Sequence, residues 1–283
     1  MCPGFYPGSK RSMNTVISAI IALRNSESRV IFTIREILYL FLKLIPKNTI
    51  VPVLLGKLKG KKWIIGSALS AFWLGTYEYE KQILFSRIIR KGAVVYDIGA
   101  HAGFHTLLVS SLVGPAGKVF AFEPSPRNAR YLRKHLEINH CDNVTVIEAA
   151  VAEEDGTAFL EEDQEYTVGL TGRLSAEAGR KIKTVSLDNL VSSGRIPPPE
   201  YMKIDVEGAE LQVFFGAKKI LSDSRPVIFL STHGVDIHAQ CCAFLTSLNY
   251  LLEPIDENKY IVTRRELLGF TPSQKHLIHG ESL

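Results

Sequence analysis

The sequence lacks the features that mark a membrane-spanning, secreted or disulfide-stabilised protein. No apolar run reaches the roughly 18 uninterrupted residues of a membrane-spanning helix, because charged residues interrupt the apolar N-terminal third. The apolar run 16–23 is too short for a signal peptide. The 283 residues include only 4 cysteines, which show no C-x-x-C spacing, and two of them are adjacent. These absences predict a cytoplasmic protein with reduced thiols.

Compositional extremes are absent as well. Hydrophobic residues make up 46% of the chain and charged residues 22%, which excludes a disordered or fibrous protein. No internal repeat is visible. The net charge is only +4, but residues 1–75 carry 11 Lys or Arg against 2 acids, a net charge of +9, which leaves the rest of the chain at −5. The two parts therefore differ in the partners that their charge favours.

Residues 1–75 are predicted to form a basic, apolar and helical extension that precedes a main domain at 76–283. Within the extension, residues 29–63 combine an apolar helical pattern with a lysine cluster beside Trp63, formed by Lys57, Lys59, Lys61 and Lys62. Apolar insertion next to a polybasic patch is typical of peripheral contact with the anionic inner face of a membrane. The apolar face could instead pack against the main domain or against a second copy in a homo-oligomer. Both interpretations remain open.

From residue 94 onward the chain alternates strand-like and helix-like segments, which predicts an α/β fold with a doubly wound, mostly parallel sheet. The expected strands lie at 94–98, 117–124, 143–151, 200–206, 225–232, 250–255 and 259–265, and the expected helices at 101–113, 125–139, 187–194, 207–221 and 236–249. The segment 152–187 breaks the alternation with two short β-like runs around a polar stretch. We expect an inserted hairpin or flap there.

The turn after the first of these strands, "DIGAHAG" at 97–103, lacks the glycines of a dinucleotide site. The fingerprint G-x-G-x-x-G places pyrophosphate on a helix N-terminus, but His101 and Phe104 stand where the second and third glycines should be. Asp97 adds a carboxylate at the mouth of the turn, which would repel a pyrophosphate and attract a cation. Asp97 could also cap the following helix.

Acidic residues follow the ends of four of the predicted parallel strands. Ligands of open α/β sheets bind beyond the carboxyl ends of the strands, where this chain has Asp97, Glu123, Glu148 and Asp205, with Ser231 and His233 ending a fifth strand. Glu123 lies 26 residues after Asp97, where a carboxylate can accept both hydroxyls of a ribose. A nucleoside that carries a positive charge and no phosphate, such as S-adenosylmethionine, suits this edge.

Five motifs in order, "GTYE", "YDIGAHAG", "FAFEPSP", "VSLDNL" and "KIDVEGAE", closely resemble the FkbM family of S-adenosylmethionine-dependent methyltransferases. The resemblance runs from about Trp73 to about His233. It implies a class I methyltransferase fold, which is a Rossmann-like sheet of seven strands with one antiparallel. It also implies methyl transfer, usually to an oxygen of a sugar, a polyketide or a similar natural product, including a glycan.

The resemblance also implies roles for individual residues. The donor's methionine part would lie in the turn, its ribose on Glu123 and its adenine near Glu148 and Ala149, while Tyr77 and Glu78 would close the pocket. The implied cofactor-binding residues are Tyr77, Glu78, Asp97, Gly99, Ala100, His101, Gly103, Glu123, Pro124, Ser125, Glu148 and Ala149. Two positions depart from the family pattern. His101 stands where Asn is frequent, which makes the side chain titratable, and Ser231 stands where Glu is frequent.

Three residues are candidates for catalysis. His233 is the leading general base, because an unperturbed imidazole pKa of about 6.5 suits proton removal near neutrality. Asp205 and Glu207 could position the acceptor or hold a divalent metal that acidifies its hydroxyl. A metal is not the favoured interpretation, and the His101 and His105 spacing predicts no zinc site, because no H-E-x-x-H motif accompanies it. Glu210 is expected only to favour a helix N-terminus, and Lys203 to have a structural partner.

The sequence therefore predicts an O-methyltransferase. N-methylation of a small amine and a non-catalytic nucleoside-binding module remain alternatives. A nucleic-acid amino-methyltransferase is disfavoured, because "DVEG" at 205–208 does not match the N/D-P-P-Y type of loop that such enzymes usually carry after the fourth strand.

Overall fold

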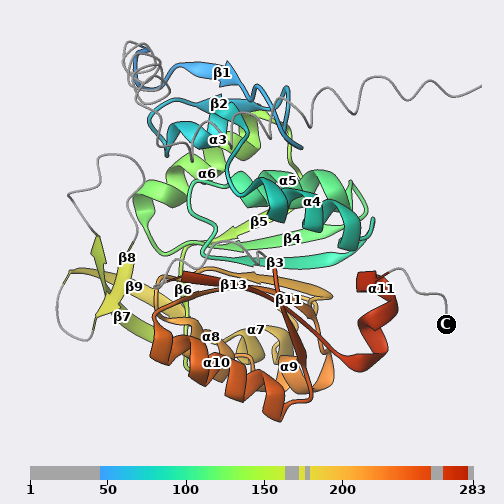
Figure 1. Ribbon diagram of the computed structural model, residues 1–283. Coiled ribbons are helices and arrows are strands. Elements are labelled where there is room, and N and C mark those ends of the chain that lie inside the picture. Colours follow the sequence, from blue (N-terminus) through green and yellow to red (C-terminus); the bar gives the residue numbers. More distant parts are fainter. Residues whose placement is uncertain (1–44, 163–171, 176–178, 256–263, 280–283) are drawn as a thin grey trace, which may run out of the picture. The chain divides into compact units, whose positions relative to one another are not determined.

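The computed structural model describes residues 45–162, 172–175, 179–255 and 264–279 (Figure 1). The chain divides into two compact units, one ending at Tyr79 and the other starting at Glu80. The predicted boundary at 75/76 lies close to this division. Among the described residues, no helix combines the length and the apolar character needed to cross a bilayer.

The described part of the first unit differs from the expected helical extension. It contains an antiparallel pair of strands, β1 (Ile50–Pro52) and β2 (Lys62–Ile64), followed by one short helix, α3 (Ser70–Leu74). Gly56 and Gly60, both with positive φ, lie in the connection between the strands, where glycine favours a turn over a helix. The apolar helix predicted upstream falls largely on residues 1–44, outside the described residues.

In the second unit, seven of the described strands form the main sheet. Their order is β12-β13-β11-β10-β3-β4-β5. Neighbours pair in parallel except that β13 runs antiparallel to both β11 and β12. This arrangement confirms the predicted class I methyltransferase sheet with one antiparallel strand. The strands are β3 (Val94–Ile98), β4 (Lys118–Phe122), β5 (Val144–Ile147), β10 (Tyr201–Ile204), β11 (Val227–His233), β12 (Leu251–Pro254) and β13 (Arg264–Phe270).

Helices cover both faces of this sheet, as Figure 1 shows. One face carries α4 (Tyr79–Ile88), α5 (Phe104–Val113) and α6 (Pro126–Ile138), and the other carries α7 (Leu187–Ser192), α8 (Glu210–Phe215), α9 (Lys218–Asp223) and α10 (Val235–Ser247). A 3-10 turn (Pro272–Gln274) and α11 (Lys275–His279) follow β13. Because both faces are covered, the inner strands β3, β4, β10 and β11 are almost continuously buried, whereas the edge strand β5 is only partly buried.

The segment 152–187 forms most of a separate small sheet. Strands β6 (Ala150–Val151), β7 (Gly156–Glu162), β8 (Gly172–Ser175) and β9 (Arg180–Val185) pair in the order β6-β9-β7-β8. The β-like runs read from the sequence correspond to β7 and β9, which pair antiparallel. Strand β8 lies in the stretch that the sequence suggested was only polar. The small sheet begins just after β5, at the carboxyl edge of the main sheet.

Three predicted elements are wrong in detail. The single strand expected over 143–151 is two strands, β5 in the main sheet and β6 in the small sheet. The single helix expected over 207–221 is two helices, α8 and α9, which are separated at Gly216. A Cβ at Gly216 would lie 2.0 Å from the carbonyl oxygen of Ala152, so the close approach of another segment explains the break. The last strand, expected at 259–265, is β13 at Arg264–Phe270, and residues 259–263 lie outside the described residues.

Candidate functional site

The candidate site lies where the strand order of the main sheet reverses. Chain order runs from β3 to β4 and β5 on one side and from β10 to β11 on the other, and ligands of such sheets bind at this switch point. Gly99, directly after β3, has φ 76°, and a Cβ there would lie 1.9 Å from the carbonyl oxygen of Asp205. Glycine is therefore required at this position, because the turn after β3 touches the backbone after β10.

The structure gives Asp97 a different surrounding from the one expected. Its side chain is fully buried, with Oδ1 3.1 Å from Nζ of Lys203 and Oδ2 accepting a 2.6 Å hydrogen bond from the hydroxyl of Thr106. Lys203 and Asp97 are register partners on the parallel strands β10 and β3. The charge of Asp97 is thus compensated inside the protein. Asp97 is also not the N-cap of α5, a position that Gly103 occupies.

Glu123, at the end of β4, lies against the same turn. Its side chain is 5% exposed, and its oxygens accept hydrogen bonds from the backbone N–H groups of His101 (2.7 Å) and Ser125 (2.9 Å). Burial raises the pKa of Glu123 to about 7, although these two hydrogen bonds oppose the rise. Ser125, which follows the half-buried Pro124, is the N-cap of α6. Glu123 therefore joins the turn after β3 to the start of α6.

Backbone hydrogen bonds also join the turn to the end of β4. The N–H groups of Gly99 and Ala100 both donate to the carbonyl of Phe122, each at 3.0 Å. At Gly103, where φ is 94°, a Cβ would lie 2.5 Å from Cδ1 of Leu132. His101 adopts φ 52°, and burial, followed by the charges of Lys203 and Arg127, lowers its pKa to about 4. Its imidazole is therefore neutral at physiological pH, and a histidine here adds no charge near neutrality.

The residues implied for the adenine end are less enclosed. Glu148 follows β5, and its Oε2 lies 2.7 Å from Nη1 of Arg133 on α6. Both side chains are largely exposed, so the pair contributes at most about 1 kcal/mol. Ala149 is buried. Tyr77 and Glu78 belong to the first unit, where Tyr77 stacks on Phe72. Their role in closing the donor pocket stays a prediction.

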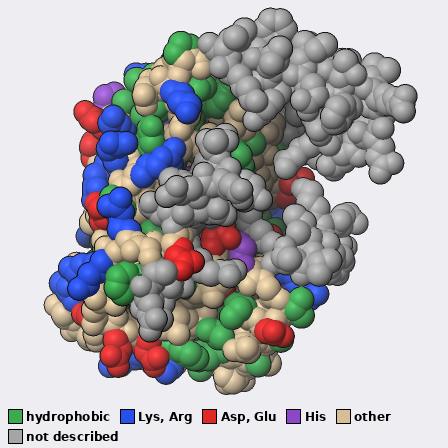
Figure 2. All heavy atoms as spheres, turned by 90° about the vertical axis from the view of Figure 1, so that its left-hand side faces the viewer, with side chains coloured by type: hydrophobic (Ala, Val, Ile, Leu, Met, Phe, Trp, Pro, Cys, Tyr) green, Lys and Arg blue, Asp and Glu red, His purple; other side chains and the backbone are tan. Residues whose placement is uncertain are grey.

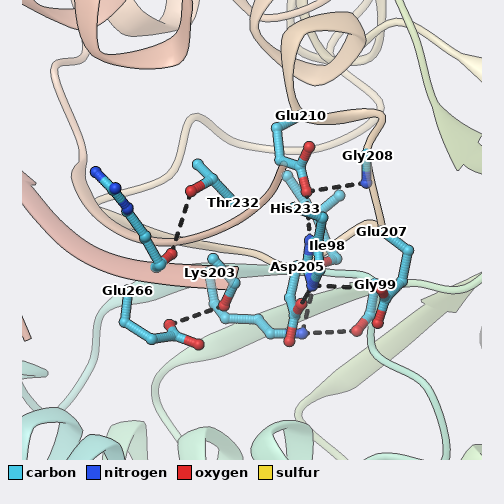
Figure 3. Close-up of polar contacts among 12 residues, drawn as sticks. Ile98, Gly99, Lys203, Asp205, Glu207, Gly208, Glu210, Thr232, His233 and Glu266 are labelled. Atoms are coloured by element: carbon cyan, nitrogen blue, oxygen red, sulfur yellow. Dashed lines mark hydrogen bonds and ion pairs between the residues drawn. The ribbon is translucent and has the colours of Figure 1, made fainter. Parts of the chain in front are cut away.

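On the other side of the switch point, the three predicted catalytic residues come together around His233 (Figure 3). Nε2 of His233 lies 3.3 Å from Oε2 of Glu207 and 3.6 Å from Oδ1 of Asp205. One ligand-type atom from each of the three residues lies within 4.8 Å of the others, so this group could also hold a metal ion. Figure 2 shows acidic and histidine side chains gathered near the middle of one face, with Lys and Arg along one margin.

Glu210 is a site residue that the sequence analysis missed. It starts α8, as expected, but its side chain is fully buried, and its Oε1 lies 2.7 Å from Nδ1 of His233 and accepts a 3.1 Å bond from the N–H of Gly208. An ionised carboxylate only accepts hydrogen bonds, so Nδ1 carries a proton and Nε2 faces Asp205 and Glu207. The available signal was that Glu210 follows Glu207 by three residues in the sequence.

The surroundings of His233 change its proton affinity. Burial alone would lower the pKa of His233, but the hydrogen bond to Glu210 and the charges of Asp205, Glu207 and Glu210 outweigh burial, and the pKa is raised above 6.5. The sequence analysis assumed an unperturbed pKa for His233, and this assumption is wrong. Above this raised pKa, Nε2 is free to take a proton.

The departure at Ser231 also has a structural explanation. Its hydroxyl donates to Oε2 of Glu266 at 2.8 Å, and Nζ of the buried Lys81 lies 2.7 Å from the same oxygen. Ser231 and Glu266 are register partners on β11 and β13. A carboxylate therefore reaches this point of the sheet from the neighbouring strand. Neither Lys81 nor Glu266 stood out in the sequence, because their contact depends on how β13 pairs.

The Methyltransferase FkbM domain matches residues 97–252, more than half of the chain. The chain belongs to the FkbM methyltransferase family. This finding confirms the predicted family.

Individual relatives match over shorter stretches. The chain is 33% identical over 143 residues to the hexuronic acid methyltransferase AglP of Haloferax volcanii, which covers 50% of this chain and 57% of AglP. It is 36% identical over 59 residues to a protein-L-isoaspartate O-methyltransferase of Ignicoccus hospitalis, covering 21% of this chain and 28% of that protein. The chain thus spans little more than half of AglP and a smaller part of the isoaspartate enzyme.

Among solved structures, the methyltransferase FkbM from Methylobacillus flagellatus aligns with a TM-score of 0.45 and 16% identity, over 63% of this chain and 43% of that one. Fibrillarin from Aeropyrum pernix, solved with bound S-adenosyl-L-methionine, aligns with a TM-score of 0.43 and 12% identity, over 64% and 68% of the two chains.

Proposed function

We propose that this protein is an S-adenosylmethionine-dependent methyltransferase that methylates a hydroxyl of a sugar, a glycan or another small natural product. The observation that carries the proposal is the convergence of Asp205, Glu207 and His233 beside the turn at Gly99, in a chain of the FkbM family. The similarity to a hexuronic acid methyltransferase supports a sugar as the acceptor.

The donor side fits S-adenosylmethionine. The oxygens of Glu123 accept two backbone N–H groups and a side-chain hydrogen bond from Asn128. A carboxylate has about four acceptor positions, so one remains for a ribose hydroxyl. The turn at Gly99, Ala100, His101 and Gly103 would receive the methionine part, with Asp97 acting through the turn. Glu148 and Ala149 would flank the adenine. The bound donor would supply an electrophilic methyl group on a sulfonium.

On the acceptor side, the neutral imidazole of His233 acts as the base. Glu210 holds the proton on Nδ1, so Nε2 is the nitrogen that would take the proton of the acceptor hydroxyl. The acceptor oxygen would form its bond to the methyl carbon as the bond from that carbon to sulfur breaks, and S-adenosylhomocysteine would leave. Asp205 and Glu207 position the acceptor. Because the donor is a good methylating agent, the protein contributes mainly alignment and proton removal.

The same three side chains suit a second role, as ligands of a divalent cation. The spacing of their ligand atoms within 4.8 Å supports this alternative, and such a cation would acidify the acceptor hydroxyl. The response of turnover to a chelator distinguishes the two roles. We expect turnover by the base mechanism to survive EDTA, whereas loss of activity with EDTA and its recovery with Mg²⁺ would replace the base with a metal.

The proposal is tested by incubating the protein with S-adenosylmethionine labelled in its methyl group and with small-molecule and glycan extracts. Mass spectrometry should find a labelled methyl on an oxygen of a sugar-containing product. A labelled nitrogen would establish the amine alternative. Donor binding without any labelled product would support the non-catalytic module, and failure to bind the donor would overturn both.

We also propose peripheral contact with an anionic membrane through the first unit. Three of its clustered lysines, Lys57, Lys59 and Lys62, are exposed, and Leu54 nearby is 45% exposed. Trp63, in contrast, is fully buried, so it belongs to the core of the unit and is not a lipid anchor. Contact from the cytoplasmic side would favour a lipid-linked glycan as the acceptor.

A further inference from the structure

We infer that Lys203 is a positioning residue that holds the turn after β3 in the shape that binds the methyl donor. The inference rests on the proposed function. It concerns a residue that lies in the middle of a strand and that the sequence suggested only had a structural partner.

Lys203 reaches across from β10 into the turn. Its side chain is 4% exposed, and Nζ donates to the carbonyl of Gly99 at 2.6 Å while lying 3.1 Å from Oδ1 of Asp97. A longer contact of 3.5 Å joins Nζ to the carbonyl of Ile98. Figure 3 shows the extended side chain of Lys203 pointing at Gly99. The ammonium group therefore contacts two successive carbonyls and the carboxylate at the end of β3.

These contacts fix a particular peptide plane. The carbonyl of Gly99 is held by Lys203, and the N–H of Ala100, in the same planar peptide group, donates to Phe122. The next N–H, that of His101, donates to Glu123. Without Lys203, one end of this chain of contacts is released at a glycine, where the backbone rotates most freely. The expected result is a turn that no longer holds one shape before the donor binds.

Charge compensation of Asp97 alone does not explain the lysine. A buried ion pair commonly stabilises a fold no more than well-packed neutral residues do. The contact with Gly99, in contrast, is a hydrogen bond that an apolar residue cannot make. Strand β10 also leads directly to Asp205, so Lys203 ties the donor turn to the strand that carries an acceptor residue. Small misplacements between such sites are costly for methyl transfer.

The test separates the hydrogen bond from the charge. Asp97→Asn is combined with either Lys203→Met or Lys203→Gln, so that no carboxylate is left buried without a cation. The two double variants are similar in size, and only the glutamine can donate to the carbonyl of Gly99. Binding of S-adenosylmethionine and of S-adenosylhomocysteine is measured by calorimetry, and melting temperature by circular dichroism.

We expect Asp97→Asn/Lys203→Met to bind both ligands at least about 20-fold more weakly than Asp97→Asn alone, and the glutamine variant to recover about fivefold or more. Equal affinities of the two double variants would overturn the inference. A loss confined to one ligand would also overturn it, because S-adenosylhomocysteine lacks the sulfonium charge, and such a loss would indicate an effect of charge.

A control variant guards against a general loss of stability. The amide of Asn143 donates to the carbonyls of Ser110 and Gly114 at the opposite edge of the sheet, so Asn143→Ala should lower the melting temperature and leave donor affinity unchanged. If the wild-type protein binds neither ligand, the proposed function fails. If the wild type binds and the double variants bind equally, only the role of Lys203 fails.

Discussion

At the scale of single residues, the ionisation of Glu123 links the donor site to stability. Burial raises its pKa from 4.5 to about 7, so the protonated form is favoured by folding. Its contribution to stability is fully present below the unfolded-state pKa and is lost as the pH rises through the folded-state pKa. Between about pH 5 and 8, wild type should therefore lose up to about 3 kcal/mol relative to Glu123→Gln. Urea denaturation measures this difference, and parallel pH curves for the two proteins would contradict it.

His233 gives the second prediction at this scale. His233→Ala should lower turnover by about 100-fold or more, because it removes the proton acceptor, and leave donor binding unchanged. In wild type, turnover should rise with pH through the raised pKa of His233, since only the neutral imidazole acts as a base.

The variant Glu210→Gln tests the partner of His233 while keeping the size of the side chain. It removes one negative charge next to Nδ1 and should move the pKa of His233, read by NMR of the imidazole, to lower pH. Full activity of His233→Ala would remove it as the base, and an unmoved pKa in Glu210→Gln would contradict the role given to Glu210.

Some of these site residues could be predicted from the sequence, and others could not, because their contacts depend on how distant strands pair. Asp205, Glu207 and His233 follow strand ends, and chain order alone places strand ends of a parallel sheet at one edge. Lys203 and Asp97 meet because β10 and β3 pair in one register, and Ser231 and Glu266 meet because β13 turns back against β11. Local hydrophobic periodicity does not determine the pairing register between distant strands, so these contacts became visible only in the structure.

At the scale of elements, the apolar strands and amphipathic helices were predicted where periodicity was strong. The break between α8 and α9 could not be predicted from periodicity, because it follows from the close approach of Ala152 to Gly216. Gly216→Ala should cost about 1 to 3 kcal/mol of unfolding free energy, since the added methyl meets backbone that cannot move away. Gly156→Ala is the control, because its nearest atom would lie at an ordinary 3.5 Å. Equal stability of the two variants in urea would show that the backbone yields.

At the scale of the whole molecule, the uneven charge predicts where the protein binds. The lysines of the first unit should attract anionic lipid, each contributing about 1 kcal/mol near the surface. Binding to vesicles that contain phosphatidylserine should fall as salt rises and disappear when Lys57, Lys59, Lys61 and Lys62 are changed to Gln. Sedimentation with neutral and anionic vesicles measures both effects.

The control for that experiment carries the same change of charge on the second unit, where Lys91, Lys118, Lys134 and Lys181 are exposed. Changing these four to Gln should leave vesicle binding nearly intact, because net charge alone does not place a protein on a membrane. Equal losses in the two quadruple variants would indicate attraction by total charge. Failure of the wild type to bind any vesicle at any salt concentration would leave the first unit as a packing or dimerisation element, and would remove the reason to favour a lipid-linked acceptor.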